Sequence, residues 1–113
     1  MSDRTIGILG LGIFGTSVLT ALAKQDMNII AIDDHAEHIN QFEPVLARGV
    51  VGDITDEELL RTAGIDTCDT VVVATGENLE SSVLAVMHCK SLGVPRVIAK
   101  VKSQTAKKVL EKI

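Results

Sequence analysis

The sequence has almost no aromatic side chains: its 113 residues include two Phe but no Trp and no Tyr. Its hydrophobic content of 46% is therefore nearly all aliphatic or small, which is typical of a core between buried parallel strands and covering helices. No apolar stretch approaches the roughly 18 residues that cross a bilayer. The first residues show no secretory signal pattern. We expect a cytoplasmic protein without direct membrane insertion.

Basic charge and closely spaced cysteines are scarce as well. The formal net charge is −4 and the pI is near 5.2, so the chain lacks the positive field that binds nucleic-acid backbones. We expect no nucleic-acid partner. Cys68 and Cys89 lack the spacing of a metal or redox motif, which favours reduced thiols with a structural role.

What the sequence does contain is a glycine-rich turn between a strand-like run and a helix-like segment. The run Ile6–Leu9 leads directly into Gly-Leu-Gly-Ile-Phe-Gly. In this G-x-G-x-x-G pattern Gly10 permits a tight turn, Gly12 lets a phosphate approach the backbone, and Gly15 allows close packing of helix and strand. Backbone N–H groups and the helix dipole then face an anion. The pattern predicts a phosphate site; the alternative is that the glycines serve packing alone.

An acidic residue follows at the spacing typical of a dinucleotide site. Asp33 ends a second apolar run, Asn28–Ile32, and stands 18 positions after Gly15. A carboxylate there would accept from ribose hydroxyls and repel a 2′-phosphate, which favours NAD, AMP, ADP or ATP over NADP. The neighbouring Asp34 either shares this role or caps the next helix.

Short β-branched runs alternate with amphipathic stretches along the whole chain. This alternation predicts an α/β fold: a Rossmann-like doubly wound parallel sheet in three αβα layers, with five or six strands. Right-handed crossovers give the strand order 3-2-1-4-5, with a ligand site where the order reverses. Strands are expected near Thr5–Leu9, Asn28–Ile32, Gly49–Val51, Thr70–Ala74 and Arg96–Val101, and helices near Phe14–Gln25, Ala36–Ala47, Asp56–Thr62, Leu79–Leu92 and Thr105–Ile113.

Boundary signals support two of these helices. Thr55 and Glu58 have capping-box spacing at the start of the third helix. Gly93 and Pro95 are expected to end the fourth. We expect one domain, residues 1–113, and the final helix without a following strand suggests a fragment of a longer chain.

Three further segments follow predicted strands and should reach the same sheet edge. Asp53 could accept from an adenine amino group while Ile54 covers its ring, or the pair could form an ordinary turn. Lys100 could meet a terminal phosphate or be a solvated side chain. After the fourth strand, small residues would let a ribose or phosphate come close: Ala74, Thr75 and Gly76.

Catalysis is not expected. There is no second domain to supply a substrate pocket, and no G-x-x-x-x-G-K-[ST] loop. The histidines His35, His38 and His88 have no arrangement with a Ser or Cys nucleophile, and we expect surface roles for them.

With these residues the chain resembles the N-terminal RCK domain, also called KTN or TrkA-N, of the gating subunits of Ktr and Trk potassium transporters. The resemblance covers essentially the whole chain. It rests on Ile8–Gly15, Ala31–Asp33, Gly52–Asp56, Val71–Asn78, Val97–Lys102 and Lys108–Ile113.

The resemblance implies a regulatory domain that binds ATP, ADP or AMP, or NAD and NADH. It also implies homodimers within a ring, octameric in the family, beneath a membrane potassium-translocating subunit at the inner face of the cell membrane. Nucleotide exchange would change the ring's shape and the transporter's opening. The implied cofactor-binding residues, phosphate turn first, are Gly10, Gly12, Ile13, Phe14, Gly15, Asp33, Asp34, Asp53, Ile54, Ala74, Thr75, Gly76 and Lys100.

One residue departs from the family pattern. Members that respond to ATP usually have Arg at the position of Ile13, where it meets the terminal phosphate. Without that charged donor, preference for ATP over ADP should be weaker. The family's C-terminal lobe is also absent from these residues. Two alternatives stay open: an NAD-binding domain of an oxidoreductase separated from its substrate domain, and a module that has lost its ligand.

Overall fold

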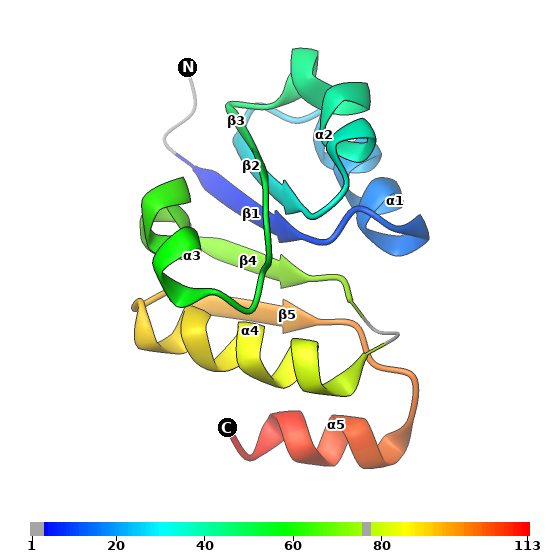
Figure 1. Cartoon of the computed structure of the whole chain (residues 1–113), viewed down its shortest axis with the longest axis vertical. Coiled ribbons are helices and arrows are strands. Elements are labelled where there is room, and N and C mark those ends of the chain that lie inside the picture. Colours follow the sequence, from blue (N-terminus) through cyan, green and yellow to red (C-terminus); the bar gives the residue numbers. More distant parts are fainter. Residues whose placement is uncertain (1–3, 76–77) are drawn as a thin grey trace.

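The computed structural model describes residues 4–75 and 78–113 and places five parallel strands in one sheet (Figure 1). The strand order is β3-β2-β1-β4-β5 and all four pairings are parallel. This is the order expected from right-handed crossovers, and it confirms the Rossmann-like fold. The strands are β1 (Thr5–Leu9), β2 (Asn28–Asp33), β3 (Arg48–Val51), β4 (Thr70–Val73) and β5 (Arg96–Ala99).

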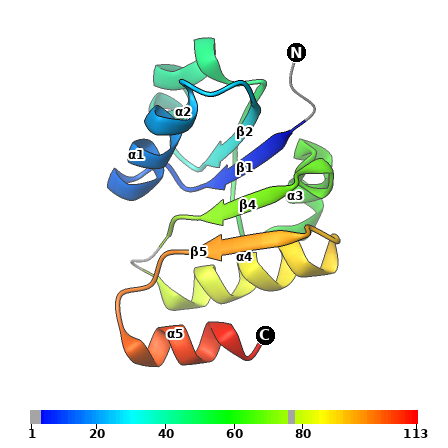
Figure 2. The same cartoon turned by 180° about the vertical axis from the view of Figure 1, so that it is seen from behind.

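Helices cover both faces of the sheet, giving three αβα layers (Figures 1 and 2). Successive side chains of β1 and β2 point to opposite faces of the sheet and pack into two separate cores. One core packs against α1 (Ile13–Leu22) and α2 (Ala36–Phe42), and the other against α3 (Glu57–Ala63) and α4 (Leu79–Ser91). The last helix, α5 (Gln104–Glu111), lies beside α4 and joins the second core through Leu110.

The second helix is shorter than the sequence predicted. It ends at Phe42 rather than Ala47, and a 3₁₀ turn, Glu43–Val45, follows it. Pro44 is the physical reason: it has no N–H to donate back along the helix, and its ring would clash with a carbonyl one turn earlier.

The prediction of a capping box at the start of the third helix was wrong. Asp56 is the N-cap, and its side chain accepts from the Leu59 N–H at 3.2 Å. Thr55 instead donates from its N–H and its hydroxyl to Asp53 Oδ1, at 2.8 and 2.7 Å. The end of α4 is as predicted, because Gly93 takes a left-handed φ of 83° just after it.

Among the residues the structure covers, no helix combines the length and the apolar character needed to span a bilayer. The longest of them, α4, has 13 residues.

The two cysteines are buried in the core beside α4. Burial raises the pKa of both the Cys68 and the Cys89 thiol to about 12. An ordinary thiol with a pKa of about 8.5 is roughly a quarter ionised at pH 8, whereas these would be ionised about once in 10⁴ molecules. We expect neither to react with a disulfide reagent such as DTNB in the native protein, and both to react after unfolding in guanidinium. Rapid reaction in the native state would contradict this burial.

Candidate functional site

The carboxyl ends of the strands meet at one edge of the sheet, where a cleft of about 320 Å³ opens. Residues just beyond the strand ends still bond to neighbouring strands: Gly10 N donates to Ile32 O at 2.8 Å, and Ala74 N to Leu9 O at 2.8 Å. The cleft therefore lies at the reversal of strand order, between β1 and β4. Eight residues expected from the sequence line it: Gly10, Gly12, Asp33, Asp34, Asp53, Ile54, Ala74 and Thr75.

The three glycines of the turn have separate structural roles. Gly10 adopts a φ of +99°, which L side chains rarely take. A Cβ at Gly15 would overlap the carbonyl oxygen of Gly10, so helix and turn pack directly against each other there. A Cβ at Gly12 would meet nothing within 4 Å. The turn is thus closely packed at two positions and open at the third.

The N-terminus of α1 carries no capping side chain. Its N-cap is Gly12, and no acidic residue stands in its first turn. By contrast, the side chains of Asp56, Asn78 and Ser103 accept backbone N–H groups at the starts of α3, α4 and α5. The first N–H groups of α1 and the positive end of its dipole are suited to an anion.

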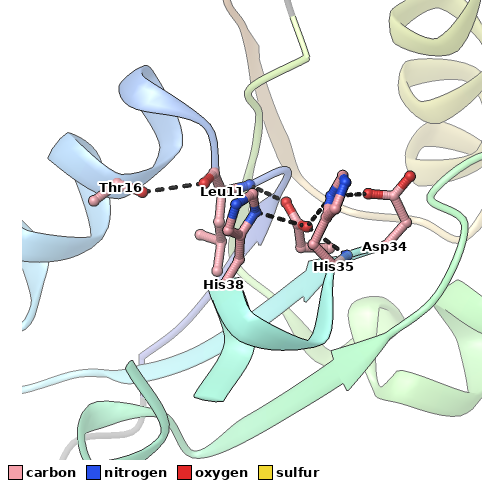
Figure 3. A network of polar contacts seen from close by, with 6 residues as sticks. Leu11, Thr16, Asp34, His35 and His38 are labelled. Atoms are coloured by element: carbon pink, nitrogen blue, oxygen red, sulfur yellow. Dashed lines mark hydrogen bonds and ion pairs between the residues drawn. The ribbon is translucent and has the colours of Figure 1, made fainter. Parts of the chain in front are cut away.

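Asp33 joins the glycine turn to the start of α2 (Figure 3). The residue is only 7% exposed. Its Oδ2 accepts from Leu11 N at 2.7 Å, and its Oδ1 accepts from His35 N at 2.8 Å. The ring Nδ1 atoms of His38 and His35 lie 3.0 and 3.3 Å from the same Oδ1. The carboxylate therefore holds the second residue of the turn in place.

These contacts set the charge at the cleft wall. Burial alone raises the pKa of Asp33, but hydrogen bonds from Leu11 N, His35 N and the His38 ring outweigh it, so the pKa lies below its ordinary value. The pKa of His35 is raised, first by the charge of Asp34 and then by its contact with Asp33. At neutral pH the Asp33 carboxylate is ionised.

The loop after β3 forms the opposite wall. Hydrogen bonds from the N–H and the hydroxyl of Thr55 lower the pKa of Asp53. Ile54 is 8% exposed and belongs to the core as well as to the cleft lining. His88 Nε2 lies 2.9 Å from Thr55 O. Hydrogen bonds between Thr55 and Asp53 within the loop, and the contact from His88 on α4, therefore hold the loop in place.

The other sequence-based candidates lie elsewhere. Ile13 is 92% exposed at the start of α1 and is not among the lining residues. Phe14 lines a separate groove over β1, β4 and β5. The Lys100 ammonium lies 5.4 Å from the Phe14 ring centroid, and Lys100 lines a hollow beside α5. Gly15 is buried within α1. Gly76 falls outside the described residues.

Three lining residues were missed from the sequence: His35, His38 and Ser81. Gly52 and Asn78 also line the cleft, and both lie in segments that the sequence placed at this edge. The two histidines were assigned to the surface, yet both lie against Asp33. Their spacing from Asp33 and from each other, Asp-x-His-x-x-His, was the available signal, because residues three apart share one face of a helix.

The strand order, the glycine turn and the cleft at the switch point define a Rossmann-like α/β domain. Residues 6–113 match the model of the TrkA-N domain, and the chain belongs to this family. The resemblance seen in the sequence is thereby confirmed.

Named relatives agree with this assignment. The chain is 34% identical over 110 residues to Ktr system potassium uptake protein C of Bacillus subtilis (strain 168), covering 97% of the chain and 50% of that protein. It is 30% identical over 113 residues to Ktr system potassium uptake protein A of the same strain, covering 100% of the chain and 51% of that protein. The chain thus spans about half the length of these curated relatives.

Solved structures share the fold at lower identity. The NAD(P)-binding domain of an exopolyphosphatase-related protein from Archaeoglobus fulgidus superposes with a TM-score of 0.80 at 22% identity, covering 95% of this chain and 80% of that one. The GsuK channel bound to NAD gives a TM-score of 0.80 at 17% identity, covering 98% of this chain and 20% of that one.

Proposed function

We propose that the cleft binds an adenine nucleotide, namely ADP, ATP or AMP, or NAD or NADH. The observation that carries this proposal is the uncapped N-terminus of α1, open at Gly12, with the ionised Asp33 beside it. The free N–H groups at the start of α1 suit phosphates, and the Asp33 carboxylate suits ribose hydroxyls. The GsuK channel, a fold neighbour with structures bound to NAD and to ADP, supports this choice of ligand class.

Each group of such a ligand would have a matching part of the cleft. Phosphates would lie on the N–H groups of Gly10–Gly15, and adenine against Ile54 with Asp53 accepting its amino group. A ribose hydroxyl would donate to Asp33 Oδ1 in place of His35 Nδ1, the longest of the contacts at that oxygen. Ala74 and Thr75 would form the far side. Asp34 lies at the rim and is 73% exposed in its side chain.

We further propose that the chain is a non-enzymatic regulatory domain of a potassium transport system. Its family and the names of its relatives support this role. The domain would assemble as a homo-oligomer, a dimer or a ring such as an octamer, and contact a membrane potassium-translocating subunit from the cytoplasmic side. Signalling requires that two states of the assembly differ in affinity for two nucleotides.

A thermal-shift panel with AMP, ADP, ATP, NAD, NADH and NADPH tests the binding step. A ligand at about 100 times its dissociation constant adds ~2.7 kcal/mol, and each kcal/mol moves the midpoint by roughly 4–8 °C in a domain of this size. We expect clear stabilisation by adenine nucleotides and little by NADPH. Flat curves throughout would contradict the proposal. For the regulatory step, potassium flux through the cognate transporter reconstituted with the full-length regulator should respond to the same nucleotides.

Ile13 allows a test of phosphate recognition. Because it is 92% exposed at the start of α1, an Arg side chain can be placed there without disturbing the core. We expect Ile13→Arg to raise ATP affinity more than ADP affinity, since a charge-assisted contact to the terminal phosphate is gained only with ATP. Ile13→Gln, which adds length without charge, is the control. Equal gains for both nucleotides would refute this role of position 13.

A further inference from the structure

We infer that Asp33, His35 and His38 form a binding site for a divalent transition-metal ion of the zinc class. Within residues 4–75 and 78–113 they are the one group of three His, Cys, Asp or Glu side chains close enough to hold an ion together. Their ligand atoms all lie within 4.8 Å of one another. The inference needs no nucleotide, because all three ligands come from the chain itself.

The geometry is already near that of a coordination site. The Nδ1 atoms of His38 and His35 lie 3.0 and 3.3 Å from one oxygen, Asp33 Oδ1. Zinc bonds of about 2.0–2.1 Å place neighbouring ligand atoms of a tetrahedron roughly 3.3 Å apart. In Figure 3 dashed lines join both histidine rings to the same oxygen. Two edges of the ligand triangle therefore have the required length, and the third is no longer than 4.8 Å.

The carboxylate is oriented before any ion arrives. Leu11 N and His35 N donate to its two oxygens at 2.7 and 2.8 Å. Such secondary contacts fix the direction of a metal ligand and strengthen binding. The side chains of His35 and His38 are 58% and 37% exposed and border the cleft, so an ion can reach them from solvent.

The ligand set selects the class of ion. Two imidazole nitrogens and one carboxylate oxygen suit zinc, cobalt or nickel, whereas magnesium and calcium prefer oxygen ligands alone. Three protein ligands leave a fourth position for water or a group entering from the cleft. Asp34 Oδ1, 2.7 Å from His35 Nδ1, adds negative charge beside the ion. Because Asp33 is also the proposed ribose contact, the ion and a nucleotide compete for it.

Calorimetric titration of the untagged, nucleotide-free protein with Zn²⁺ tests the site, with Co²⁺ absorption as a probe of its ligands. We expect one ion per chain and no saturable binding of Mg²⁺. His35→Ala and His38→Ala should each weaken Zn²⁺ binding at least about tenfold. His88→Ala is the matched control, because His88 contacts Thr55 O and Glu57 and lies outside the group. It should leave the affinity unchanged.

Three results would overturn the inference: no saturable Zn²⁺ binding, unchanged affinity in both histidine variants, or a sulfur-to-cobalt charge-transfer band, which would indicate cysteine ligands. Thermal unfolding of each variant checks its fold, and His38→Gln, which keeps a polar group near Asp33, replaces any alanine variant that fails to fold. His38→Ala retains Asp33, so nucleotide affinity measured on it tests the proposed function separately from the metal site.

Discussion

Replacing Gly15 with Ala should lower the free energy of unfolding by about 2–3 kcal/mol, in the upper part of the usual cost of forcing an extra group into a packed site. The new Cβ would overlap the carbonyl oxygen of Gly10, a backbone atom that no side-chain rotation can move. Helix α1 must then shift away from the turn, and the proposed phosphate site would be lost with it. Urea unfolding measures the change, and the midpoint of thermal unfolding should fall by at least about 8 °C.

Gly12→Ala is the matched control in the same turn. Its Cβ would meet nothing within 4 Å, and the backbone φ of −77° suits alanine. Stability should stay within about 0.5 kcal/mol of the parent. Nucleotide affinity should nevertheless fall at least about tenfold, which is about 1.4 kcal/mol, because the methyl group would occupy the path proposed for the phosphate. Similar stability losses in both variants would contradict the separate roles of the two glycines.

Replacing Asp33 with Ala should both destabilise the protein and weaken nucleotide binding. The carboxylate accepts from Leu11 N and His35 N, and Leu11 is 2% exposed. Its removal leaves a buried N–H without its acceptor, at a cost of about 2–3 kcal/mol. The carboxylate pKa lies below its ordinary value of 3.8, so the part of this stabilisation that depends on the charge is present above about pH 4 and is lost as the pH falls further. The difference between parent and variant should therefore shrink in acid.

Asp33→Asn separates the two roles. An amide oxygen can still accept from Leu11 N, so the variant should lose less stability than the alanine variant. It lacks the charge that favours ribose hydroxyl donors, and its affinity for every adenine nucleotide should fall roughly tenfold or more. Calorimetry on both variants provides the comparison. Unchanged nucleotide affinity in Asp33→Asn would remove this residue from the ligand site.

The sheet was predictable because its signals are local and repeated. Runs of β-branched residues predicted the ends of all five strands to within about two residues. The rule that crossovers are right-handed then predicted the order of the strands in the sheet. Gly93 marked the end of α4 because a left-handed residue there has few substitutes. The end of α2 was misplaced because helical periodicity was followed past Pro44.

The cleft was predictable only in part, because the remaining contacts depend on tertiary structure. Spacing alone could not decide whether Asp53 or Glu58 would engage Thr55. Nor could it show that His35 and His38 lie against Asp33, since that requires β2 and α2 to meet at a fixed angle. Lys100 follows the edge strand β5, and its ammonium lies over Phe14, a contact between segments far apart in the chain.

An NMR titration of the ¹⁵N-labelled protein with ADP would detect nucleotide binding in the cleft residue by residue. We expect the largest shifts at the amides of Leu11–Gly15 and further shifts at Asp33, Ile54 and Thr75, all following one binding curve. These amides should change much less in Gly12→Ala at the same ADP concentration. Absence of shifts, or shifts confined to the groove over β1, β4 and β5 that Phe14 lines, would contradict nucleotide binding in the cleft.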